Sequence, residues 1–92
     1  MVVNQDIILE VYKSVLNGSL SYADADRWAW DMSQLLDDGK LNFEPEKDEA
    51  ILWELIQYLY GIDTPSMTDR TKTARDNLDI KEFLKEKNIE LK

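Results

Sequence analysis

Apolar side chains recur every three or four residues in four separate stretches of the chain, which is the spacing of one face of an α-helix. The predicted helices span approximately residues 5–17, 22–38, 45–60 and 79–88. No stretch alternates between apolar and polar residues convincingly enough to predict a strand. We therefore expect an all-α protein, a small bundle of about four helices in one globular domain covering residues 1–92.

Polar residues and glycines at the ends of these stretches support the predicted boundaries. Asn4 and Ser21 precede the first two helices and can accept hydrogen bonds from their free N–H groups. Asp79, with Glu82 three residues later, is predicted to cap the last helix. Each of the first three helices is followed by a glycine that can adopt the left-handed conformation of a helix stop: Gly18, Gly39 and Gly61.

The third helix is apolar over well over half of its circumference. The residues concerned are Ile51, Leu52, Trp53, Leu55, Ile56, Tyr58, Leu59 and Tyr60. A helix of this kind must be enclosed by its neighbours, so we expect it at the centre of the bundle. The connections around Gly18 and Gly39 are short, which favours antiparallel packing of consecutive helices.

The connection before the last helix, residues 62–78, is long and polar and contains three cations, Arg70, Lys72 and Arg75. A structureless connection of this length inside a small domain is usually functional or disordered. Two interpretations stay open: a mobile loop without a partner, or a loop that contacts another protein.

Negative charge is concentrated in the middle of the chain. The formal net charge is −8, and residues 21–60 contain ten acidic residues against three basic ones. Nucleic-acid binding is disfavoured because it depends on cations that replace condensed counterions. Ordinary solubility would also account for this acidity. Without cysteine, a basic leader or a long apolar run, the chain is expected to be a soluble cytoplasmic protein with no membrane segment.

The composition excludes the common catalytic arrangements. Histidine and cysteine are absent, which removes histidine-based triads, thiol nucleophiles and the usual zinc ligands. Asp37, Asp38 and Gly39 resemble part of a calcium loop, but Leu36 and Pro45 then fall at liganding positions. We therefore expect no enzyme activity, no cofactor and no metal.

Two tryptophans separated by one residue pose the main functional question. On the second helix Trp28 shares a face with Ala25, Ala29 and Met32, which is the predicted core face. Trp30 points to nearly the opposite side, among acidic residues. Either the chain covers Trp30 with its own loop or tail, or the ring is an anchor on a surface that binds a basic partner.

The segment "VLNGSLSYADADRWA", residues 15–29, resembles a group of short acidic bacterial proteins, some of which are similar to immunity proteins of toxins. The resemblance continues in "WELIQYLYGID" and "DIKEFL". It implies a non-catalytic immunity or inhibitor protein that neutralises a cognate toxin domain, plausibly a basic nuclease, by acidic occlusion. An adaptor module that uses the 62–78 loop is the alternative. The residues expected to contact a protein partner are Asp26, Trp30, Asp31, Gln34, Asp37, Asp38, Arg70 and Lys72.

Overall fold

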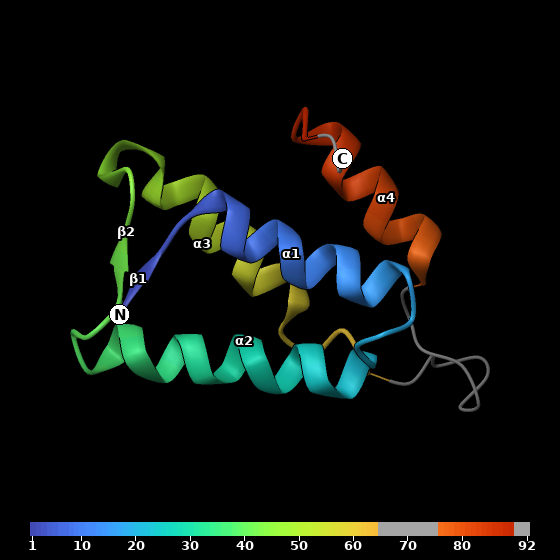
Figure 1. The fold of residues 1–92 in the computed structure, drawn as a ribbon, viewed down its shortest axis with the longest axis horizontal. Helices are drawn as coiled ribbons and strands as arrows, with labels where there is room; N and C mark the ends of the chain where they lie inside the picture. The colour runs from blue at the N-terminus through green and yellow to red at the C-terminus, as the bar shows by residue number, and fades with distance from the viewer. Residues whose placement is uncertain (65–75, 90–92) are drawn as a thin grey trace.

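A computed structural model describes residues 1–64 and 76–89 of the chain, and α-helices account for most of that part (Figure 1). The all-α bundle predicted from the sequence is confirmed. The elements in chain order are β1 (Val2–Val3), α1 (Gln5–Leu16), α2 (Tyr22–Asp37), β2 (Asn42–Phe43), a 3₁₀ turn (Glu46–Asp48), α3 (Glu49–Leu59) and α4 (Asn77–Glu86).

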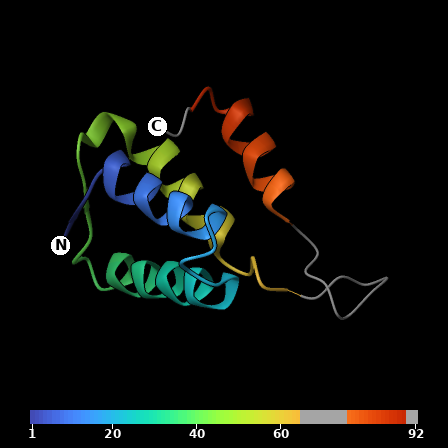
Figure 2. The same ribbon diagram turned by 45° about the vertical axis from the view of Figure 1, so that its right-hand side comes forward.

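Helices α1 and α3 run in the same direction, and α2 runs antiparallel to both (Figures 1 and 2). Each of the two parallel helices is preceded by a short strand, and the strands pair in parallel, Val2 with Asn42 and Val3 with Phe43. Parallel strands need a long crossover, which α1 and α2 supply together. The expectation of no strand was wrong here, because two residues are too few to produce a recognisable alternation.

The predicted caps of the first two helices are confirmed. The Asn4 side chain accepts a hydrogen bond from the N–H of Ile7 at 2.9 Å. The Ser21 hydroxyl accepts one from the N–H of Asp24 at 3.1 Å. The three predicted stop glycines all have positive φ angles, between 71° and 83°. Local sequence signals therefore set these helix ends.

The start of α4 differs from the prediction. Asp76, not Asp79, is the capping residue, and the two form a reciprocal capping box with both hydrogen bonds at 3.0 Å. The helix therefore begins at Asn77, two residues earlier than expected. Asn77 is held in place because its side-chain oxygen accepts a 2.6 Å hydrogen bond from the Tyr22 hydroxyl. The predicted 62–78 loop is shortened accordingly, and Arg70, Lys72 and Arg75 lie outside the described residues.

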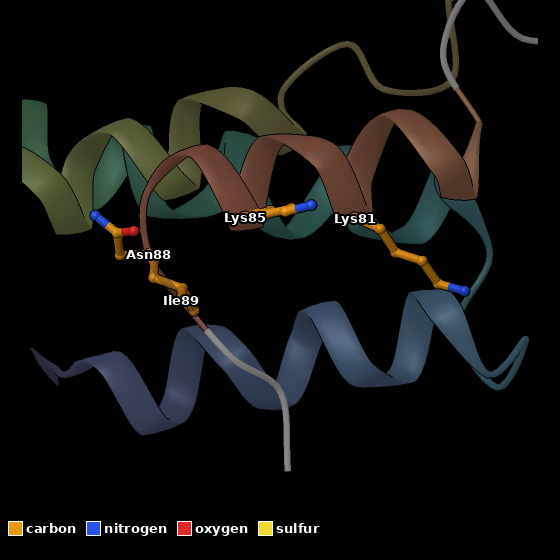
Figure 3. A pocket seen from close by; sticks show the side chains of 4 residues that line it. All are labelled: Lys81, Lys85, Asn88 and Ile89. Carbon is orange, nitrogen blue, oxygen red and sulfur yellow. The ribbon is translucent and has the colours of Figure 1, made fainter.

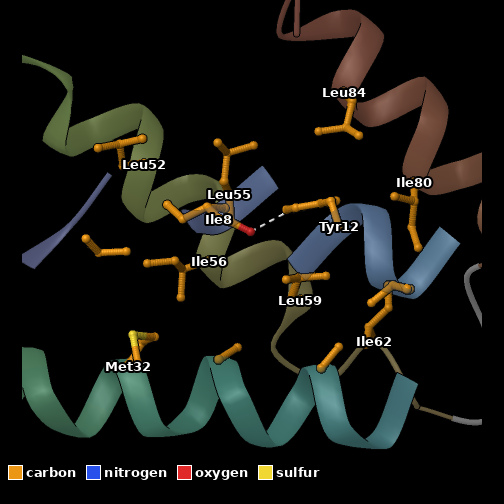
Figure 4. Close-up of a cluster of buried hydrophobic side chains, with 14 of the residues drawn as sticks. Ile8, Tyr12, Met32, Leu52, Leu55, Ile56, Leu59, Ile62, Ile80 and Leu84 are labelled. Atoms are coloured by element: carbon orange, nitrogen blue, oxygen red, sulfur yellow. Dashed lines mark hydrogen bonds between the residues drawn. The ribbon is translucent and has the colours of Figure 1, made fainter. Parts of the chain in front are cut away.

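The core lies where α1, α2 and α3 meet, and α4 closes one side of it (Figure 4). On α2 the small side chains of Ala25 and Ala29 are fully buried, which lets the neighbouring helices approach closely. The Tyr12 hydroxyl, also fully buried, donates a 2.7 Å hydrogen bond to the Leu55 carbonyl and so links α1 to α3. Other buried residues include Val3, Ile8, Val15, Met32, Phe43, Leu52, Ile56, Leu59, Ile62, Ile80 and Leu84.

Helix α3 has α1, α2 and α4 as neighbours, which agrees with the central position predicted for it. Its contact with α4 includes a stacked ring pair, Tyr58 and Phe83, with centroids 3.9 Å apart, and a salt bridge from Lys87 to Glu54. Tyr60 departs from the prediction because it is 54% exposed. The helix ends at Leu59, and Tyr60 already has an extended backbone conformation that takes it out of the enclosed stretch.

Among the described residues, no helix combines the length and the apolar character that crossing a membrane requires.

Candidate functional site

Trp30 is an exposed side chain, with 43% of its surface accessible to solvent. Trp28, two residues earlier on the same helix, is half-buried and packs against the core. The buried face of α2 consists of Ala25, Ala29 and Met32. The two indoles therefore separate as their angular positions predicted. The loop and tail that were the candidates to cover Trp30 lie for the most part outside the described residues, as positions 65–75 and 90–92, so that alternative stays open.

The outward side of α2 consists of two adjacent stripes, each with residues spaced by four, three and four positions. One stripe contains Asp26, Trp30, Ser33 and Asp37, and the other contains Arg27, Asp31, Gln34 and Asp38. This spacing places the members of a stripe one above the other on the helix surface. We call Asp26, Trp30, Asp31, Gln34, Asp37 and Asp38 the acidic face; these are the α2 residues predicted from the sequence to contact a partner.

Most carboxylates of the acidic face have no partner among the described residues. In the part of the chain that the structure describes, no hydrogen bond or salt bridge engages the side chains of Asp31, Asp37 and Asp38, and all three are exposed. Arg27 is the single cation on the two stripes. The face thus presents an aromatic ring within a negative field that is open to solvent.

Asp26 has a structural role that the sequence did not reveal. Its Oδ1 accepts a hydrogen bond of 2.6 Å from the backbone N–H of Gly61, and its side chain is half-buried. The contact joins α2 to the turn after α3, across 35 positions in the sequence. Asp26 therefore fixes the geometry of the acidic face with one oxygen and leaves the other available.

Tyr60 is the exposed ring that sequence reasoning missed. It was assigned to the enclosed surface of the third helix, yet it is more exposed than Trp30. The residue after it is Gly61, whose N–H is bound by Asp26, so its backbone lies at the edge of the acidic face. The signal available in the sequence was its position directly before a helix-stop glycine.

Tyr22 is a titratable group with a clearly shifted pKa. Burial of the Tyr22 hydroxyl raises the pKa of Tyr22 above its ordinary value of 10.0, and the nearby carboxylates of Asp76 and Asp79 raise it further. The hydroxyl is therefore neutral at physiological pH and donates a hydrogen bond to Oδ1 of Asn77. It holds α4 to the start of α2 and does not belong to the acidic face.

Hollows lined by described residues lie elsewhere on the surface. One is lined by Lys81, Lys85, Asn88 and Ile89, on the side of α4 that overhangs α1 (Figure 3). The other, at the start of α1, is lined by Asn4, Gln5, Asp6, Glu44, Pro45 and Asp48. In the described residues, no group of three or more acidic side chains is placed to hold a metal ion. Trp30 is not among the residues that line either hollow.

The arrangement on α2 has the components of a protein-binding surface. An exposed indole can anchor a contact, and unpaired carboxylates around it select partners of positive charge. Of the eight residues predicted to bind a partner, the structure brings together the six on α2, while Arg70 and Lys72 fall outside the described residues. No protein-family model, no curated protein and no solved structure matches this chain.

Proposed function

We propose that this protein is a non-catalytic inhibitor, of the immunity type, that binds a basic toxin domain through the acidic face of α2. The observation that carries the proposal is the exposure of Trp30, 43% accessible, within a set of carboxylates that no cation of the described residues pairs. Tryptophan is enriched among the residues that carry most of the binding energy in protein interfaces. The cytoplasm of a bacterium is where such a protein would meet its partner.

The distribution of charge supports a basic partner over an acidic or neutral one. The acidic face contains four aspartates, and Arg27 is the nearest cation on the same helix. Complementary charge speeds association and rejects partners of the wrong sign, while a central ring that becomes buried in the complex contributes most to the affinity. Nucleic acid is repelled by the same carboxylates.

Inhibition would follow from occlusion without any chemical step. A nuclease that binds a polyanion needs a cationic cleft, and the row of carboxylates on α2 offers that cleft a competing anionic surface. Trp30 would supply the apolar contact that slows dissociation. Because α2 is anchored at Ala25 and Ala29 by burial and at Asp26 by a hydrogen bond, the face is preorganised.

The test is rescue of bacterial growth. The protein is expressed together with the toxin candidate encoded by the neighbouring gene, as wild type and as the double variant Trp30→Ala/Asp37→Ala. We expect the double variant to lose protection, because removing an interface anchor alone costs about 2 kcal/mol or more, roughly a thirtyfold loss in affinity. Circular dichroism establishes that the variant is folded, which is expected because both side chains are exposed.

A matched control removes one exposed apolar and one exposed acidic side chain elsewhere. Ile7→Ala/Glu10→Ala does this on α1, where Ile7 is 39% exposed. We expect this variant to protect as well as the wild type. Full rescue by a folded Trp30→Ala/Asp37→Ala protein, or the absence of any rescue by the wild type, would contradict the proposed function.

A further inference from the structure

The second exposed ring, Tyr60, lies beside the acidic face, at the end of a stripe on α3. Trp53 and Gln57 are spaced by four positions and share one side of α3, and Tyr60 follows directly after the end of the helix. Tyr60 is 54% exposed, Gln57 is exposed and Trp53 is half-buried. This stripe is therefore accessible to a partner.

The other sides of α3 are occupied, which fixes the direction of this stripe. Tyr58 and Glu54 contact α4, Leu55 receives the hydrogen bond from α1, and Ile56 points toward α2 (Figure 4). At about 100° per residue, Trp53 follows Ile56 on the side away from Leu55, and therefore away from α1. The stripe therefore lies along the outer edge of the contact between α3 and α2.

The corresponding edge of α2 is the stripe that contains Trp30. The hydrogen bond from Gly61 to Asp26 joins the two edges at one end. Trp30 is one helical turn beyond Asp26, about 6 Å along the helix, and Tyr60 is the residue next to Gly61. We call Asp26, Trp30, Gln57 and Tyr60 the α2–α3 seam. It contains two exposed rings, one from the residue next to Gly61 and one from the residue a helical turn beyond Asp26.

The seam has the chemistry that recognises a planar cation. Asp26 uses Oδ1 for Gly61, and among the described residues no donor engages its Oδ2. In the same part of the chain, no cation lies over the ring of Trp30 or Tyr60; the cation–ring contact present is that of Lys87 with Phe83. A guanidinium group stacks on aromatic faces and donates to carboxylates in its own plane, whereas an ammonium group does not match both at once.

We propose that the basic partner docks an arginine side chain on the α2–α3 seam, with its guanidinium against the rings of Trp30 and Tyr60 and its N–H groups directed to Oδ2 of Asp26. This inference rests on the proposed function, because it names the chemistry of the partner residue that the same surface receives. It also extends the surface from α2 to Tyr60. The occupant is an arginine-bearing segment of a protein.

The experiment uses two blocked peptides as probes, one of alternating arginine and glycine and one of alternating lysine and glycine. Binding to the full chain is followed by the indole N–H signals in ¹H–¹⁵N spectra, where Trp28 serves as an internal control because it packs against the core. We expect both peptides to shift the Trp30 signal, and the arginine peptide to bind about two- to fivefold more tightly, because its guanidinium can stack on a ring and donate to the carboxylate at the same time.

Two variants at position 60 distinguish the contribution of the Tyr60 ring to binding from that of its hydroxyl. Tyr60→Ala is expected to lower the affinity for the arginine peptide to that for the lysine peptide, and Tyr60→Phe to keep the preference. The exposure of Tyr60 makes both variants compatible with folding, which circular dichroism checks. Equal binding of the two peptides, or a preference that Tyr60→Ala leaves intact, overturns the arginine inference and leaves the proposed function standing. If neither peptide shifts Trp30, both proposals fail.

Discussion

The carboxylate of Asp26 on α2 accepts a 2.6 Å hydrogen bond from the backbone N–H of Gly61, directly after α3 has ended. We predict that Asp26→Ala lowers the free energy of unfolding by about 1–2 kcal/mol, because it leaves a partly buried N–H without its charged acceptor. Urea denaturation followed by circular dichroism measures the change. Asp26→Asn keeps an acceptor oxygen and should lose less; equal losses in the two variants would show that the hydrogen bond is not the cause.

The hydrogen bond between the Tyr12 hydroxyl and the Leu55 carbonyl leads to a second prediction. Tyr12→Phe keeps the ring in the core and removes the 2.7 Å contact. The expected loss is about 1 kcal/mol, the usual net value of such a bond. Thermal unfolding with and without the substitution gives the difference. A loss of about 3 kcal/mol or more would instead indicate that the core had been repacked around the missing oxygen.

Tyr22 makes the stability of the protein vary with pH in the alkaline range. Its pKa is higher in the folded protein than in the unfolded chain, because burial and the carboxylates of Asp76 and Asp79 oppose ionisation. The folded state therefore binds this proton more tightly, so the stability that Tyr22 contributes is present below pH 10 and is lost as the pH rises through the folded-state pKa.

The measurement compares the wild type with Tyr22→Phe by urea denaturation over a series of pH values. At neutral pH the variant should be less stable by about 1 kcal/mol, because it lacks the hydrogen bond to Asn77. Above pH 10 the difference between the two proteins should shrink. A difference that stays constant across this range would mean that the Tyr22 pKa is not raised on folding.

The contact between α3 and α4 should depend on ring packing more than on its ion pair. Phe83 stacks on Tyr58, whereas Glu54 is 48% exposed in its salt bridge with Lys87. We predict that Phe83→Ala costs about 2–3 kcal/mol and that Glu54→Gln costs less than about 1 kcal/mol. Hydrogen exchange of the α4 amides should show the same order of destabilisation within that helix. Comparable losses of stability in the two variants would contradict the prediction that ring packing outweighs the ion pair.

The helices could be predicted from the sequence because their signals are local. Asn4, Ser21 and the stop glycines act within a few residues, and the apolar spacing determines which face is buried. The start of α4 could not be predicted in this way. Asp76–Asp79 and Asp79–Glu82 have the same spacing, and the choice between them is accompanied by a contact between Asn77 and Tyr22, 55 positions away.

For the candidate site too, the sequence predicted the features that depend on local helical spacing and missed those that depend on tertiary contacts. The outward position of Trp30 follows from helical periodicity, and its exposure agrees with that prediction. The second role of Asp26 and the exposure of Tyr60 depend on where α3 ends relative to α2, which is a tertiary property. Arg70 and Lys72 lie outside the described residues, so their part in binding stays a prediction.

The functional account depends on Trp30 being an open indole in a negative field. Fluorescence quenching of Trp28→Phe/Trp53→Phe, in which Trp30 is the remaining tryptophan, measures both properties with matched concentrations of caesium and iodide ions. We predict that caesium quenches relatively better than it does for free tryptophan, that iodide quenches relatively worse, and that Asp31→Asn/Asp37→Asn reduces this contrast. A blue-shifted emission that neither ion quenches, or quenching ratios equal to those of free tryptophan, would contradict the account.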